Sequence, residues 1–103
     1  MSEQAAETPV LDLLAKMTAD SLETADLDAQ TLILVRIAAL VAVDAPPASY
    51  LMNLGAAGEL GVTEDQVRGV LAAVAPIVGT ARVASATGNI VRALGIAIEA
   101  AEA

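Results

Sequence analysis

Apolar residues recur at helical spacing in several segments of this chain, and short stretches rich in proline, glycine or acids separate the segments. From Val10 to Met17 the apolar residues return every three or four positions, which predicts a first helix from about Pro9 to Ala19. Thr8 is suited to cap this helix, and proline is tolerated in a first turn. The polar residues 1–7 are therefore predicted to form a disordered leader.

The second predicted helix, about Ala29 to Val43, is apolar nearly all round, so we expect it to be central. Arg36 is its only charge, and such a guanidinium either pairs at a subunit interface or faces a cavity and binds a carboxylate. Asp26 and Asp28, which precede the helix, form either a metal-binding pair or a helix cap. The cap is favoured, because hard cations usually need more oxygen ligands than two aspartates supply.

A double proline at 46–47 ends the second helix, and a third predicted helix follows it and is closed by a left-handed Gly61. This helix carries Tyr50, the only aromatic residue of the chain. Ser49 and Asn53 lie one turn apart, so they share a face of the helix. The stretch therefore holds the candidate site, although a buried asparagine can also simply fix helix register.

Two further helices complete the predicted fold. Thr63 and Gln66 have the spacing of a capping box, which starts a fourth helix that Pro76 is expected to kink or end near Val78. Thr80 can cap the last helix.

Arg82 lies near the proline break, so it is either paired at the surface or lines a pocket. Gly55, Gly58, Gly88 and Gly95 lie inside predicted helices, where glycine is unfavourable, and they predict close approach of neighbouring helices.

Composition supports an all-α protein with one domain over residues 8–103. The chain has 103 residues, of which 56% are hydrophobic and only 1% aromatic, so its apolar content is mostly small and aliphatic. A chain this short leaves much of its surface exposed, yet several helices have almost no polar face. We therefore expect a homo-oligomer.

The net charge of −8 disfavours nucleic acid and anionic membranes as partners. The absence of cysteine and histidine removes disulfides, thiolate chemistry and the commonest metal ligand, so no metal or cofactor is expected. The longest apolar run, Leu32 to Val43, is short for a membrane span and contains Arg36. The first residues are acidic rather than those of a signal peptide, which predicts a cytoplasmic location.

The order of these parts resembles the carboxymuconolactone decarboxylase family, which includes the alkylhydroperoxidase D-like proteins. The family's step G-x-T-x-(D/E)-(E/Q)-(I/V) is present from Gly61, and its glycine-containing turn falls on Gly79, with Ala81 where proline is common. The likeness covers about residues 28–98. It implies a compact alkylhydroperoxidase D-like bundle of about five helices that assembles as a trimer or hexamer.

The resemblance also places the family's functional residues on this chain. The Cys-x-x-Cys of the redox branch falls on Pro46 and Ser49, its histidine on Asn53, and its acidic residue near Leu34. Thiol peroxidase activity is excluded, because none of these residues supplies a thiolate or a proton relay. The decarboxylase branch needs no cysteine, but it uses a histidine where Asn53 stands. An amide cannot act as a general acid or base, although it can donate a hydrogen bond to an oxyanion.

Three functions remain open at this point. The first is a family member that binds a small anionic molecule at the start of the third helix. The second is a non-redox lyase or isomerase of the decarboxylase type that uses a buried carboxylate such as Asp44 or Glu59, with its catalytic residues unknown. The third is a structural oligomer with a filled pocket. The candidate ligand-binding residues are Arg36, Ser49, Tyr50, Asn53 and Arg82.

Overall fold

The computed structural model describes the backbone of residues 2–102 and the side chains of residues 8–95. The described backbone forms five helices and no strand, which confirms the predicted all-α fold. The helices are α1 (Ser2–Ala25), α2 (Ala29–Ala42), α3 (Pro47–Glu59), α4 (Glu64–Val78) and α5 (Thr80–Glu102). None of the described helices combines the length and apolar character needed to cross a membrane.

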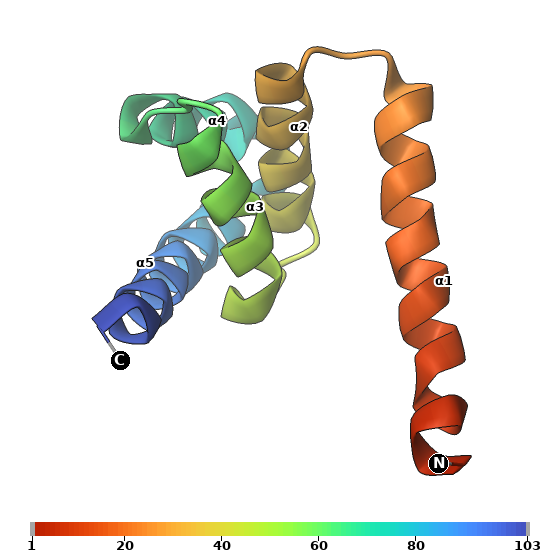
Figure 1. Ribbon diagram of the computed structural model, residues 1–103. Helices are drawn as coiled ribbons and strands as arrows, with labels where there is room; N and C mark the ends of the chain where they lie inside the picture. Colours follow the sequence, from red (N-terminus) through yellow and green to blue (C-terminus); the bar gives the residue numbers. More distant parts are fainter. Residues whose placement is uncertain (1, 103) are drawn as a thin grey trace.

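Helix α2 is the centre of the bundle, as its nearly uniform apolar character predicted. It packs against α3, α4 and α5, which in Figure 1 lie on the side of α2 that faces away from α1. Its residues Ile37 and Val41 are completely buried. Burial of a large aliphatic side chain contributes about 1.5–3 kcal/mol, so this helix organises the core.

The core consists of two clusters of buried side chains, and α3 contributes a residue to each. One joins α2, α3 and α5, and the other joins α2 to the end of α3, with partly buried residues of α4 against both. Several members are alanines, which permit close approach of helix backbones. The first cluster is Val41, Ala45, Tyr50, Ala86, Ile90 and Ala93, and the second is Ile33, Ile37 and Ala57.

Two predicted helix caps are confirmed. The Asp28 carboxylate accepts hydrogen bonds from the Thr31 hydroxyl at 2.7 Å and the Thr31 backbone N–H at 2.9 Å. These two bonds hold the pKa of Asp28 below its usual value, and the bond from the hydroxyl has the larger effect. The predicted capping box of Thr63 and Gln66 starts α4. The hydrogen bonds to Thr31 show that Asp28 caps α2.

The predicted start and end of the first helix are wrong. Helix α1 begins at Ser2, so residues 2–7, predicted as part of a leader, are its first turns and Pro9 lies inside it. The sequence Ser-Glu-Gln-Ala-Ala-Glu consists mostly of good helix formers, and this local preference outweighs the stop suggested by Thr8 and Pro9. At the other end the helix continues to Ala25, beyond the predicted end at Ala19.

The predicted close packing at glycines is also wrong. A side chain added at Gly55, Gly58 or Gly95 would meet no described atom within 4 Å, and one at Gly88 would meet only the end of the Arg92 side chain at 4.0 Å. Gly55 and Gly58 instead border surface grooves between α3 and α5. At Gly55 and Gly58, therefore, α3 does not closely approach another helix.

Helix α1 stands to one side of the bundle formed by α2–α5 (Figure 1). A three-residue connection, Asp26–Asp28, reverses the chain so that α1 and α2 run antiparallel. Asp26 has a φ of +52°, in the left-handed region that tight turns use. The position of α1 leaves one side of α2 and α3 open.

Candidate functional site

The space between α1, α2 and α3 forms a hollow of about 530 Å³, which we call the Arg36 hollow. This volume lies within the range of small-molecule binding sites. Three of the five predicted ligand-binding residues line it. Its lining consists of Thr18 and Leu22 from α1, Ile33, Arg36, Ala39 and Leu40 from α2, and Ala48, Ser49, Met52, Asn53 and Ala56 from α3.

Ser49 and Asn53 point into the hollow because they lie one turn apart near the start of α3. The amide nitrogen of Asn53 donates to the backbone oxygen of Ser49 at 3.2 Å. Neither the Ser49 hydroxyl nor the Asn53 amide oxygen forms a hydrogen bond with the described protein atoms. Both groups are therefore available to a bound molecule.

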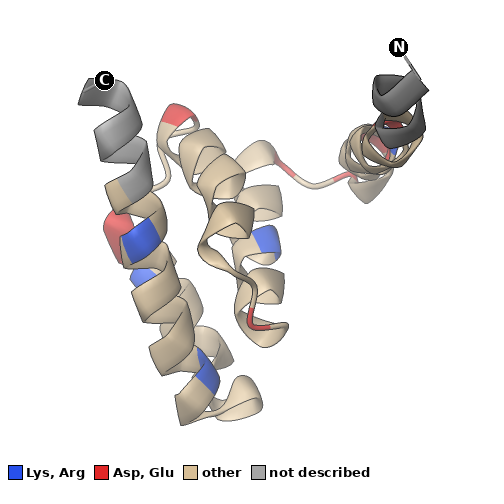
Figure 2. Ribbon diagram, turned by 90° about the horizontal axis from the view of Figure 1, so that it is seen from below, with Lys and Arg blue, Asp and Glu red and all other residues tan. Residues whose placement is uncertain are grey.

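Arg36 supplies the only positive charge of the hollow, in a bundle where charged positions are sparse (Figure 2). The side chain is half-buried, and its Nη2 donates to the hydroxyl of Ser21 on α1 at 3.1 Å. No carboxylate of the described side chains forms an ion pair with it. A guanidinium has five N–H donors, so most of its capacity remains for an anion.

The structure places Tyr50 on the opposite face of α3, away from the hollow. Its ring is completely buried among Val41, Ala86 and Ile90, and its hydroxyl has no hydrogen-bond partner in the described protein. Burial raises the pKa of the Tyr50 phenol, and the nearby carboxylate of Asp44 raises it further. Tyr50 is thus part of the core.

Arg82 is also separate from the hollow. Its Nη1 donates to the backbone oxygen of Ala42 at 2.8 Å, the last residue of α2. A cation at this end of a helix satisfies an otherwise unpaired carbonyl and interacts favourably with the helix dipole. The contact gives Arg82 a structural role.

The turn between α2 and α3 is held by polar side chains of α5. The Ser85 hydroxyl donates to the Asp44 carboxylate at 2.6 Å, and the Asn89 amide donates to the backbone oxygen of Ala45 at 3.1 Å. Asp44 has a φ of +54°, which is uncommon for a residue with a side chain. These bonds stabilise the turn and so position the start of α3.

The two carboxylates considered for catalysis lie elsewhere. Asp44 accepts the bond from Ser85, and Glu59 borders a different groove beside Ala93 of α5. No aspartate or glutamate is among the residues that line the Arg36 hollow. The hollow therefore offers a cation, a hydroxyl and an amide, but no group suited to proton transfer near neutral pH.

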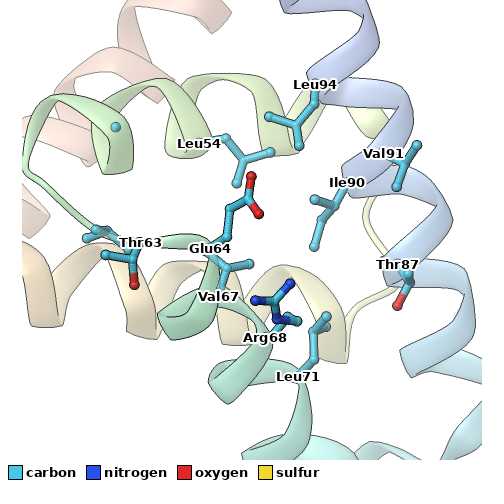
Figure 3. A pocket seen from close by; sticks show the side chains of 12 residues that line it. Leu54, Thr63, Glu64, Val67, Arg68, Leu71, Thr87, Ile90, Val91 and Leu94 are labelled. Atoms are coloured by element: carbon cyan, nitrogen blue, oxygen red, sulfur yellow. The ribbon is translucent and has the colours of Figure 1, made fainter.

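Sequence reasoning missed a second pocket, which lies between α3, α4 and α5 and has a volume of about 440 Å³ (Figure 3). Its wall is mainly apolar, and the side chains of Glu64 and Arg68 reach over it from α4 (Figure 3). Arg68 is ion-paired with Asp65. The sequence feature that points to this pocket is the pair of apolar residues Val67 and Leu71, which lie one helical turn apart beside the charged residues Glu64 and Arg68. The other lining residues are Leu54, Gly58, Val62, Thr63, Thr87, Ile90, Val91 and Leu94.

The sequence pattern of the carboxymuconolactone decarboxylase family matches residues 8–90, which include all the residues that line the Arg36 hollow. No curated protein and no solved structure matches the chain.

Proposed function

This chain belongs to the carboxymuconolactone decarboxylase family, and we propose that it binds a small anionic molecule in the Arg36 hollow. The absence of cysteine from the chain excludes the family's thiol chemistry. The observation that carries the proposal is a half-buried arginine that borders a cavity and has no carboxylate partner in the described protein. A guanidinium in this position keeps most of its N–H donors available to an anion.

The surroundings of Arg36 favour a small carboxylate with an apolar body. The guanidinium can bind the two carboxylate oxygens in its planar fork. Ser49 and Asn53 offer hydrogen bonds from the opposite wall, on α3. Ile33 and Met52 add apolar side chains to the lining of the hollow, which suits a hydrocarbon portion of the ligand.

Binding is favoured over the lyase or isomerase reaction. Both of those reactions need a group that moves a proton, and the hollow contains no carboxylate, histidine or cysteine. A filled, purely structural interior is disfavoured by the open volume between α1 and α3.

The test is a thermal-shift screen of the purified chain with succinate and benzoate, followed by calorimetry with whichever stabilises it. We expect Arg36→Gln to weaken binding about tenfold or more, because a hydrogen bond to a charged group contributes about 1.5–3 kcal/mol. Arg68→Gln is the matched control, since it removes the same charge from the wall of the second pocket, outside the hollow.

Two results would contradict the proposal. One is the absence of any shift in the wild-type protein with either acid at millimolar concentration. The other is equal affinity in Arg36→Gln and Arg68→Gln, which would place the anion outside the hollow.

A further inference from the structure

The second pocket, between α3, α4 and α5, has no part in the proposed function and shares no lining residue with the Arg36 hollow. Its volume of about 440 Å³ lies within the range of small-molecule binding sites. Leu54 and Leu71 line it as partly buried side chains, while Val91 and Leu94 on α5 are exposed. An apolar ligand would cover carbon atoms here that now face water.

Among the described residues that line the second pocket, four have polar side chains, and three of these are engaged within the chain. The Thr63 hydroxyl belongs to the capping box of α4, and the Thr87 hydroxyl donates to a backbone oxygen of its own helix at 2.9 Å. Arg68 is ion-paired with Asp65. No described lysine or arginine pairs with the fourth, Glu64. Its carboxylate is therefore the group of this lining that a ligand can engage.

Glu64 is the first residue of α4, where the helix dipole favours a carboxylate. This preference accounts for an acid at the position, and it applies equally to Asp65. The two acids differ in direction, because the Glu64 side chain extends over the pocket toward Leu54, whereas Asp65 is not among the lining residues (Figure 3). Glu64 is exposed, so its carboxylate lies at the rim of the pocket rather than deep in it.

The charges at this rim favour a cationic ligand. The ion pair of Arg68 with Asp65 is neutral, so the unpaired Glu64 makes the rim negative. The whole chain carries a net charge of −8, which attracts cations and repels anions. An ammonium group is strongly hydrated, and at an exposed carboxylate it keeps part of that hydration. An anion would have to displace Asp65 from Arg68 next to a second carboxylate.

We propose that the second pocket binds a small organic amine, with its ammonium group at Glu64 and its apolar body between α3, α4 and α5. A primary alkylamine has this form, and its amine is protonated near neutral pH. Each methylene that enters the pocket should raise the affinity about fourfold. The pocket is separate from the hollow, so Arg36→Gln should bind the amine as the wild-type protein does.

The first test is an NMR titration of the full chain near neutral pH with butylamine, hexylamine, hexanol and hexanoate. We expect hexylamine to bind more tightly than hexanol or hexanoate, and about tenfold more tightly than butylamine. Glu64→Gln should weaken hexylamine binding about two- to fivefold, the size expected of an exposed ion pair, and leave hexanol binding unchanged. Glu23→Gln is the matched control, because it removes the same charge from α1, outside the pocket.

The second test fills the pocket. A side chain added at Gly58 or Gly55 would meet no described atom within 4 Å, so leucine at either position is compatible with the fold. Both residues border the neighbouring groove, but only Gly58 lines the second pocket. Gly58→Leu should lower the affinity for hexylamine about tenfold or more, because the leucine takes the place of the alkyl chain. Gly55→Leu should keep the wild-type affinity.

The absence of saturable shifts with hexylamine in the wild-type protein would overturn the inference, and so would tighter binding of hexanoate. Equal hexylamine affinities within either matched pair would place the amine elsewhere and overturn it too. Loss of hexylamine binding in Arg36→Gln would move the amine to the hollow. If circular dichroism shows that Gly58→Leu does not fold, the comparison of Glu64→Gln with Glu23→Gln still decides.

Discussion

The two faces of α3 differ in almost every physical respect, although they belong to one short helix. On one face Tyr50 and Ala57 are buried against α2 and α5, in contacts made of apolar side chains. On the other face Ser49 and Asn53 border the Arg36 hollow and keep polar groups available. The first face determines how the helix packs in the core, and the second presents polar groups that a bound molecule can contact.

The difference arises from what lies opposite each face. Helix α5 packs closely on the Tyr50 side, where Ala86 and Ala93 allow the helices to approach. On the Ser49 side, α1 stands away from the bundle and contributes only Thr18 and Leu22 to the wall of the hollow. Substitutions on the two faces should therefore have different consequences.

The largest effect is expected for Tyr50→Ala. Removing a completely buried aromatic ring leaves a cavity in the main core cluster, so the free energy of unfolding should fall by about 3–5 kcal/mol. Urea denaturation measures this loss. Tyr50→Phe is the matched control and should change stability by less than about 1 kcal/mol, because the hydroxyl it removes has no partner in the described protein.

The same pair of proteins gives a test by pH. The raised pKa of Tyr50 in the folded state means that the folded protein keeps its phenol proton when the unfolded chain has begun to lose it. The stabilisation is complete below about pH 10 and is lost as the pH rises through the folded pKa. Tyr50→Phe should lack this part of the decline, and identical alkaline profiles would show that burial does not perturb the phenol.

An intermediate effect is expected for Asn89→Ala, on the α5 side of the turn before α3. The change leaves the buried backbone oxygen of Ala45 without its donor, which should cost about 1–3 kcal/mol. Thr87→Ala is the control, since the Thr87 hydroxyl is exposed and bonds only within its own helix. Equal melting temperatures for the two variants would show that the turn does not need Asn89.

The smallest effect is expected for Asn53→Ala, on the open face. Its amide bonds only to Ser49 in its own helix and the residue is half-buried, so stability should change by less than about 0.5 kcal/mol. Urea denaturation under the conditions used for Tyr50→Ala gives the comparison. A loss above about 1 kcal/mol would instead support the alternative that Asn53 fixes helix register.

Local signals predicted most of the helices. The cap at Asp28, the double proline at 46–47, the left-handed Gly61 and the capping box at Thr63 all lie where expected. Each acts through residues at most a few positions apart, so its effect can be read without knowing the fold. The start of α1 differs from the prediction, because the helix-forming residues before Pro9 extend the helix to Ser2.

The candidate site was predicted only in part, because its residue types were visible but their directions were not. Ser49 and Asn53 were expected together, since helix spacing alone puts them on one face. Tyr50 is adjacent in sequence but turns into the core, and Arg82 reaches the end of α2 instead of the hollow.

The amino-acid sequence determined the helices, their order, the absence of thiol chemistry and the family, because these follow from residue types and short spacings. The tertiary structure alone decided which face of α3 is buried, that Arg36 borders an open hollow, and that α1 leaves apolar side chains exposed. These features depend on which helix lies opposite which, and contacts between residues far apart in the chain decide that. Only with those contacts in place does Arg36 become distinguishable from Arg82.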